Sequence, residues 1–171
     1  AIIDVLAPAW SAALLRRMPQ VANVIASPFQ HGDFAFSARR RLGRQLAATR
    51  YQRAYILPNS WKSALVPFFA RIPERIGYQG EARYVLLNRR HRLDAAGLPQ
   101  LAQRYARLAD PIDTTSLPQV PTVHLISTAM QQRATREALG LPPDGTPIIF
   151  CPGAEYGPAK RWPVRHFAAL A

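Results

Sequence analysis

Short apolar runs alternate with segments of helical periodicity along most of this chain. Buried strands are expected at residues 1–8, 22–28 and 53–58, where Ile, Val, Leu and Ala predominate. Between these runs, residues 10–18 and 38–50 have apolar positions spaced as in helices that bury one face. Alternation of strand and helix is typical of a parallel sheet covered by helices. The sequence therefore predicts an α/β domain.

The second part of the chain continues this alternation after a longer connection. Residues 98–109 have the periodicity of an amphipathic helix, and the proline-containing residues 110–123 are expected to form an extended connector. A capped helix is predicted over residues 127–139, with a glycine as its C-terminal stop. Residues 148–151 form an apolar run with the length of a buried strand, and a polar loop and a helix starting near Pro163 follow it.

The loop after that last run carries charged residues, among them Lys160 and Arg161. In open α/β sheets, ligands bind beyond the carboxyl ends of the strands, and helix N-termini attract anions. A phosphate is therefore the expected ligand of this loop. The alternative is that both cations are solvated surface charges, which contribute little to binding or stability.

The predicted strand at residues 53–58 is followed directly by Asn59 and Ser60, either of which is a good N-cap for the next helix. Lys62 lies in the first turn of that helix, where the helix dipole disfavours a cation. A charge placed against this local preference indicates a functional role. Further on, Arg83 has a planar fork that suits phosphate or carboxylate, with an ion pair to Glu81 or Glu74 as the alternative.

The sequence contains no constellation typical of a metal site or a catalytic triad. His31 and Asp33 lie in a loop predicted at residues 29–36, and nothing else near them has the required spacing. A surface turn is therefore favoured over a catalytic pair.

The formal net charge of +12 predicts an anionic partner. Twenty arginines and two lysines exceed ten acidic residues, a balance that suits nucleic acid, an anionic membrane or a phosphorylated substrate. The predicted helix at residues 38–50 is the most basic element, with Arg39, Arg40, Arg41, Arg44 and Arg50. Its basic face is either solvated or in contact with anionic lipid headgroups. Because no aromatic residues are interleaved there, nucleic acid is not an expected partner and is supported by charge alone.

Two long blocks of sequence point to a family. Residues 152–163, PGAEYGPAKRWP, resemble the start of the second domain of the lipopolysaccharide heptosyltransferases. Residues 55–88, YILPNSWKSALVPFFARIPERIGYQGEARYVLLN, are similar to that family's first domain. The likeness is greatest to the heptosyltransferase II branch, and it fades only in residues 89–121 and 127–146.

This resemblance implies a GT-B glycosyltransferase, in which two Rossmann-like α/β domains with parallel sheets face each other across a cleft. Residues 1–124 would be the acceptor-binding domain without its first strand and helix, and residues 125–145 a connecting helix. Residues 146–171 would begin the nucleotide-sugar-binding domain. Because Ala1 is not a methionine and Ala171 interrupts a predicted helix, the chain is expected to be an internal fragment of a longer protein.

The resemblance also implies a reaction: transfer of L-glycero-D-manno-heptose from ADP-heptose to the first heptose of the lipopolysaccharide inner core. Charge develops on the β-phosphate as the donor bond breaks, and fixed cations stabilise that charge without a metal or a cofactor. Lys160 is the expected catalytic cation. The implied donor-binding residues are Glu155, Tyr156, Lys160 and Arg161, and the implied acceptor-binding residues are Asn59, Ser60, Lys62 and Arg83.

The same likeness implies that other parts of the site lie outside these residues. The general base is expected to be an aspartate upstream of Ala1, so the chain by itself is expected to be inactive. The donor's sugar contacts are expected beyond Ala171, so another nucleotide-sugar transferase of GT-B fold remains an alternative.

Composition predicts a cytoplasmic protein. The single cysteine, Cys151, excludes an internal disulfide framework, and no apolar stretch approaches the ~18–20 residues of a membrane span. The resemblance implies a lipid-linked acceptor at the cytoplasmic face of the inner membrane, where peripheral contact is expected.

Overall fold

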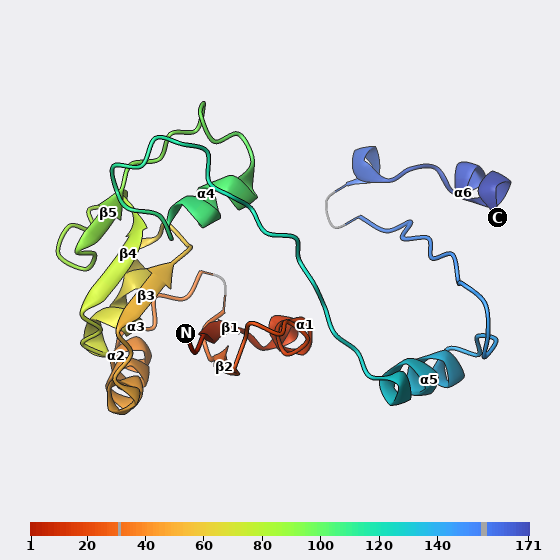
Figure 1. Cartoon of the computed structure of the whole chain (residues 1–171), viewed down its shortest axis with the longest axis horizontal. Coiled ribbons are helices and arrows are strands. Elements are labelled where there is room, and N and C mark those ends of the chain that lie inside the picture. Colours follow the sequence, from red (N-terminus) through yellow and green to blue (C-terminus); the bar gives the residue numbers. More distant parts are fainter. Residues whose placement is uncertain (31, 155–156) are drawn as a thin grey trace. The chain divides into compact units, whose positions relative to one another are not determined.

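The computed structural model of the chain describes residues 1–30, 32–154 and 157–171 (Figure 1). The chain forms two compact units, Ala1–Leu125 and Ile126–Ala171. The described strands all lie in the first unit, and the second contains two α-helices and a short 3₁₀ helix between them. The predicted division into an acceptor domain, a connecting helix and the start of a donor domain stays a prediction.

The strands of the first unit form two parallel sheets among the described residues. In one, β1 pairs with β2, and in the other the order is β3–β4–β5, with β3 to β5 side by side (Figure 1). Strands are confirmed near residues 1–8, 22–28 and 53–58, but the prediction that they are buried is wrong for β1 and β2, none of whose residues is buried. The strand bounds are β1 Asp4–Pro8, β2 Asn23–Ser27, β3 Arg53–Ile56, β4 Glu74–Tyr78 and β5 Arg89–His91.

Most of the predicted helices of this unit are present but shorter than expected. The helix expected at residues 10–18 is a 3₁₀ turn followed by a single α-helical turn. The helix bounds are η1 Ala9–Ser11, α1 Ala12–Leu15, α2 Phe36–Leu46, η2 Ala47–Thr49, η3 Trp61–Ala64, α3 Leu65–Phe69 and α4 Leu101–Arg107.

Successive side chains of a strand point to opposite faces of the sheet. The sheet of β3 to β5 packs against other residues on both of its faces. Ile56 on one face packs in a buried cluster with Ala64, Leu65, Leu86 and Leu87. Ile76 and Tyr78 on the other face pack against Leu108, which follows α4.

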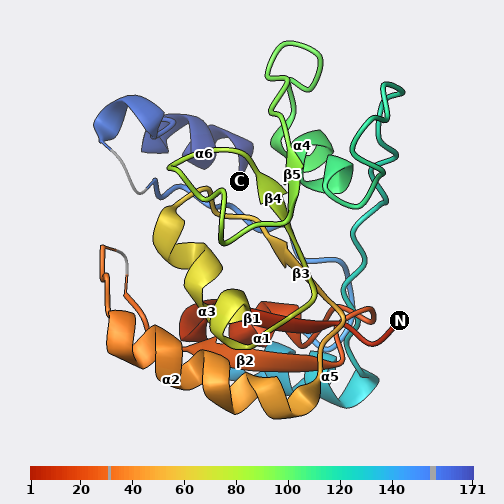
Figure 2. The ribbon, with the colours of Figure 1, turned by 90° about the vertical axis from the view of Figure 1, so that its left-hand side faces the viewer.

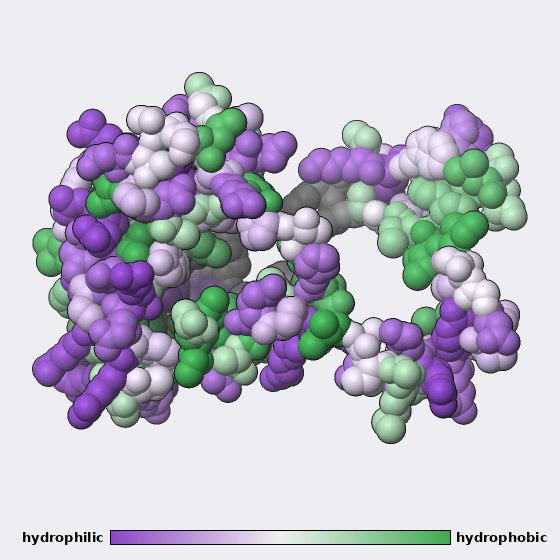
Figure 3. Space-filling view, in the orientation of Figure 1, coloured by the Kyte–Doolittle hydropathy of each residue, from purple (hydrophilic) through white to green (hydrophobic). Residues whose placement is uncertain are grey.

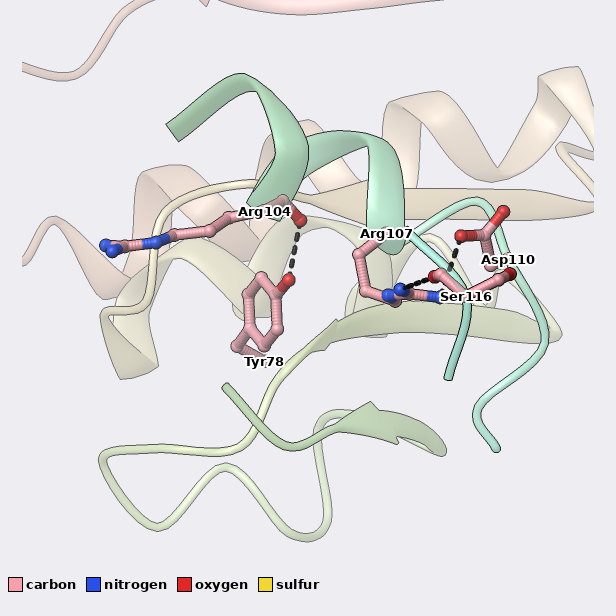
Figure 4. A network of polar contacts seen from close by, with 5 residues as sticks. All are labelled: Tyr78, Arg104, Arg107, Asp110 and Ser116. Atoms are coloured by element: carbon pink, nitrogen blue, oxygen red, sulfur yellow. Dashed lines mark hydrogen bonds and ion pairs between the residues drawn. The ribbon is translucent and has the colours of Figure 1, made fainter. Parts of the chain in front are cut away.

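Polar contacts attach α4 and the segment after it to the second of these faces (Figure 4). The Tyr78 hydroxyl donates to the carbonyl of Arg104 at 2.6 Å. The buried guanidinium of Arg107 contacts the Asp110 carboxylate at 3.1 Å and donates to the carbonyl of Ser116. Burial raises the pKa of Tyr78, so this hydroxyl remains a donor across the physiological range.

Helices α2 and α3 pack directly against each other (Figure 2). Gly43 of α2 lies at the contact: a Cβ there would come within 2.6 Å of the Phe69 Cβ and 2.7 Å of the Val66 carbonyl oxygen. A side chain at this position would therefore separate the two helices.

The second unit contains α5 Ala129–Ala138, the 3₁₀ helix η4 Pro158–Lys160 and α6 Val164–Leu170. The predicted helix at residues 127–139 is confirmed. Thr128 caps it in a capping box with Gln131, and Gly140 with φ +62° follows its end.

The strand predicted at residues 148–151 is not formed in this structure. Those residues have no regular secondary structure, and Ile148 and Ile149 are 83% and 76% exposed. A strand needs hydrogen-bonded neighbours, and the described residues of this unit provide none. Phe150 instead lies edge-to-face on Phe167 of α6, and hydrophobic surface gathers around that helix (Figure 3).

None of the helices in the described part of the chain combines the length and apolar content that a bilayer span needs.

Candidate functional site

The carboxyl ends of β3 and β4 lie at the same edge of the sheet because the two strands are parallel. The segment after β3, residues 57–63, contains three of the predicted acceptor residues, and the segment after β4, residues 79–83, contains the fourth. The structure brings the two segments together through hydrogen bonds between them. These two segments are called the carboxyl-edge loops below.

The helix after β3 begins as expected at the Asn59-Ser60 pair, but it is capped from elsewhere. Ser60 occupies the N-cap position of η3 in extended conformation, without a hydrogen bond from its side chain to the helix. The backbone N–H of Trp61 instead donates to the carboxylate of Glu81 at 2.7 Å. A charged oxygen from the second loop thus satisfies a donor at the helix N-terminus.

Arg83 is buried inside the carboxyl-edge loops, with 2% of its surface exposed. Its Nη1 donates to the Pro58 carbonyl at 2.8 Å, and its Nη2 donates to the Tyr78 carbonyl at 2.5 Å and to Asn59 Oδ1 at 3.3 Å. Burial lowers the pKa of Arg83, and the negative charge of Glu81 opposes this effect. The guanidinium therefore faces the protein interior in this structure.

The ion-pair alternative for Arg83 is wrong. The Glu74 carboxylate pairs with Arg53 at 2.9 Å, and no ion pair joins Arg83 to Glu81 among the described residues. The reason is geometric: Arg83 points inward to carbonyl groups, whereas Glu81 is exposed and reaches the N-terminus of η3.

Asn59 and Lys62 lie at the outer side of the loop after β3. Asn59 is exposed and its Oδ1 accepts from Arg83. Lys62 is half-buried in the first turn of η3, and no carboxylate in the described ranges forms an ion pair with it. A lysine that forms no ion pair in the described ranges, three residues after an exposed asparagine, suits a ligand that carries an anion and hydroxyl groups.

Arg39 is a site-forming residue that sequence reasoning missed. It was grouped with the exposed cations of its helix, but it is 7% exposed. Its guanidinium donates to the carbonyls of Phe34 at 2.7 Å, Asp33 at 3.1 Å and Lys62 at 3.2 Å, and it lies 4.1 Å from the ring centre of Phe29. The sequence alone does not distinguish Arg39 from the other arginines of this helix. Only the packing of the loop before the helix does so.

The loop that carries the predicted donor residues lies in the second unit. Lys160 ends η4 and Arg161 follows it, both exposed, four and three residues before Val164 begins α6. Trp162 stacks on His166 with ring centres 5.1 Å apart, which fixes the entry to α6. Glu155 and Tyr156 lie outside the described residues, as does His31.

Within the described ranges, no group of three or more His, Cys, Asp or Glu side chains is arranged to hold a metal ion.

Residues 39–171 match the glycosyltransferase family 9 (heptosyltransferase) family. The chain belongs to this family. It is 48% identical to lipopolysaccharide heptosyltransferase 2 of Escherichia coli (strain K12), covering 100% of this chain and 51% of that protein. Lipooligosaccharide heptosyltransferase 2 of Haemophilus influenzae is 43% identical, with 99% and 50% covered.

A solved structure supports the same assignment. The structure of the E. coli ADP-heptose lps heptosyltransferase II is similar to this chain with a TM-score of 0.86 and 45% sequence identity. The match covers 99% of this chain and 51% of that one. The predicted fold class, an α/β chain with parallel sheets of GT-B type, is thereby confirmed, as is the predicted resemblance. The chain spans about half the length of the family 9 relatives it matches.

Proposed function

We propose that the whole protein transfers L-glycero-D-manno-heptose from ADP-heptose to the first heptose of the lipopolysaccharide inner core. The observation that carries this proposal is the similarity to heptosyltransferase 2 proteins at 42–48% identity, which extends over essentially the entire chain. Both carboxyl-edge loops and the Lys160 loop lie inside the matched residues. The likeness therefore includes the segments with candidate chemistry as well as the core.

In this proposal the two units have different tasks. The carboxyl-edge loops of the first unit bind the acceptor through Asn59, Ser60 and Lys62. Arg83, predicted as a fourth acceptor-binding residue, is buried and donates to the carbonyls of these loops, so no direct contact with the acceptor is proposed for it. In the second unit, Lys160 stabilises the negative charge that develops on the leaving phosphate, as preorganised cations do. Arg161 contributes to the same donor loop, as do Glu155 and Tyr156. The acceptor hydroxyl gives its proton to a general base and attacks the anomeric carbon directly, and ADP leaves as the bond to its β-phosphate oxygen breaks.

The experiment is a transfer assay with the whole purified protein, ADP-heptose and a lipopolysaccharide acceptor that ends at its first heptose. The expected result is an acceptor heavier by one heptose, with stoichiometric release of ADP and a rate unchanged by a chelator. Transfer from a different nucleotide sugar, with ADP-heptose inert, would instead establish another GT-B transferase. Binding of arbitrary DNA with a steep loss of affinity in salt, and no transfer, would establish the nucleic-acid alternative.

A peripheral contact with the cytoplasmic face of the inner membrane is part of the same proposal. Arg40, Arg41 and Arg44 are exposed on α2 and fall within about a quarter turn of one another at helical spacing. Surface cations of this kind attract anionic lipids with about 1 kcal/mol per residue. Such contact would bring the protein to an acceptor that is itself anchored in the membrane.

A further inference from the structure

Two arginines of the first unit are buried at the carboxyl-edge loops without an ion-pair partner among the described residues. Arg39 and Arg83 are 7% and 2% exposed, and their hydrogen bonds go to carbonyl, amide and hydroxyl oxygens. Removing a charge from water is costly unless it is compensated. Burying a charge without an ion pair contributes little to stability. The contacts that both arginines make with these loops therefore point to a role in arranging the loops.

Arg83 joins the two loops to the sheet. Its two terminal nitrogens contact the carbonyl after β3, at Pro58, and the carbonyl that ends β4, at Tyr78. The same fork contacts Asn59 Oδ1 at 3.3 Å and Ser63 Oγ at 3.4 Å. The planar guanidinium fits several oxygens at fixed angles, which a lysine ammonium on its flexible stem does not reproduce. The Nε of Arg83 has no hydrogen-bond partner in the part of the chain that the structure describes. The two terminal nitrogens thus contact the loops while this buried donor is left unsatisfied.

Arg39 performs the equivalent task from α2. It joins the loop after β2, through the carbonyls of Asp33 and Phe34, to the carbonyl of Lys62. The segment that carries Lys62 is therefore held by Arg39 at the Lys62 carbonyl and by Arg83 at Pro58 and Ser63. Phe34 also stacks on Trp61 with ring centres 5.9 Å apart, which adds a second contact between the same segments.

We propose that Arg39 and Arg83 are positioning residues of the acceptor site: they hold residues 58–63 so that Asn59 and Lys62 meet an acceptor sugar that carries phosphate or carboxylate. Neither contacts the acceptor: Arg39 acts through backbone carbonyls, and Arg83 acts through backbone carbonyls together with Asn59 Oδ1 and Ser63 Oγ. Their buried positive charges also favour an anionic group nearby, because fields are screened less in a protein interior than in water. This inference rests on the proposed function.

The test uses the whole protein with four lysine variants. Arg39→Lys and Arg83→Lys keep the positive charge but replace the planar guanidinium with an ammonium group. Arg16→Lys, exposed directly after α1, and Arg89→Lys, exposed at the start of β5, are the matched controls. The acceptor KM and the ADP-heptose KM are measured for each, together with amide hydrogen exchange at Trp61 and Ser63.

The expected result is a rise of about 10-fold in acceptor KM for both buried variants, the scale of effect that misplaced binding groups produce. The ADP-heptose KM and both controls should stay within about twofold of the unchanged protein. Exchange at Trp61 and Ser63 should accelerate at least about 10-fold in Arg83→Lys, while α5 is unaffected.

An unchanged acceptor KM in either buried variant would overturn the proposal for that arginine, even if the melting temperature of the variant fell. A residue with a purely structural role lowers the folded fraction, but it does not change the acceptor KM relative to the ADP-heptose KM. If the unchanged protein transfers no heptose, the proposed function fails on its own. The hydrogen-exchange comparison then decides whether the arginines hold the loop: unchanged exchange at Trp61 and Ser63 would overturn that too.

Discussion

The carboxylate of Glu81 accepts a hydrogen bond from the backbone N–H of Trp61 at 2.7 Å, across 20 positions of the chain. Glu81 and Ala82 both have positive φ, +43° and +53°, a conformation that is strained for residues with a Cβ. The loop after β4 is thus bent so that an acid reaches the N-terminus of η3. This contact and the fork of Arg83 together make one rigid edge out of two loops.

Replacing Glu81 with alanine should lower the free energy of unfolding of the whole protein by about 0.5–1 kcal/mol, as the loss of a helix cap does. Glu81→Gln should lose less, because its amide oxygen still accepts the hydrogen bond. Denaturant unfolding measures both, with Glu137→Ala on the exposed surface of α5 as the control. An alanine variant as stable as the unchanged protein would show that water caps η3 equally well.

Gly43 should tolerate no side chain. Gly43→Ala places a Cβ about 2.6 Å from the Phe69 Cβ and 2.7 Å from the Val66 carbonyl oxygen, so α2 and α3 must move apart at a cost of about 1–3 kcal/mol. Gly80→Ala is the matched control, because a Cβ there meets nothing within 4 Å. Thermal unfolding of the two variants gives the comparison, and equal stability would mean that the helix pair adjusts freely.

Much of the fold was predictable because strands and helices of this chain carry their own local signals. The apolar runs of β1, β2 and β3 and the capped helix α5 could be recognised from residue type alone. β5 was not predicted, since Arg89–His91 has no apolar alternation. It forms because β4 offers a free edge with which to pair.

The candidate site was only partly predictable. Lys62 was recognised because a cation in a first helical turn breaks a local rule. Arg39 and Glu81 could not be recognised, because each acts on backbone groups of a segment that folding alone brings near. The apolar run at residues 148–151 shows the opposite case: its composition is that of a strand, but a strand also requires a neighbour.

Acidification should weaken the fold through His91. This side chain is 2% exposed, and its pKa is lowered, first by burial and then by Arg107 and Arg89, while Asp110 opposes the change. The folded protein therefore binds fewer protons than the unfolded chain below the ordinary histidine pKa of 6.5. The stabilising effect is complete above that value and is lost as the pH falls toward the lowered pKa.

Unfolding measured at several values between about pH 7 and pH 5 should show stability falling with pH, and His91→Gln should flatten that slope. The titration of Asp4 does not contribute to the slope in this pH range. Hydrogen bonds from Tyr51 and Asn23 lower its pKa below 3.8, so its own loss of stability occurs in more acidic solution. An identical slope in the His91 variant would locate the acid-sensitive group elsewhere.

The basic face of α2 should control binding to anionic membranes. Changing Arg40, Arg41 and Arg44 together to glutamine should weaken binding to vesicles containing phosphatidylglycerol on the order of 100-fold, at about 1 kcal/mol per charge. Arg92, Arg133 and Arg165 are also exposed, and their triple glutamine variant removes the same net charge as a control. Equal losses in the two variants would mean that net charge, and not this helix face, attracts the protein to lipid.

Lys160 should be the most sensitive cation of the second unit. Lys160→Ala in the whole protein is expected to lower kcat for heptosyl transfer at least about 10-fold, or ~1.4 kcal/mol of transition-state stabilisation, because the leaving phosphate would lose a fixed positive charge. Arg165→Ala, exposed in the first turn of α6, should leave kcat unchanged. Steady-state release of ADP measures both. If Lys160→Ala retained the full rate, the lysine would be a solvated surface charge, and the leaving phosphate would have to be stabilised by other groups such as the N–H groups at the start of α6.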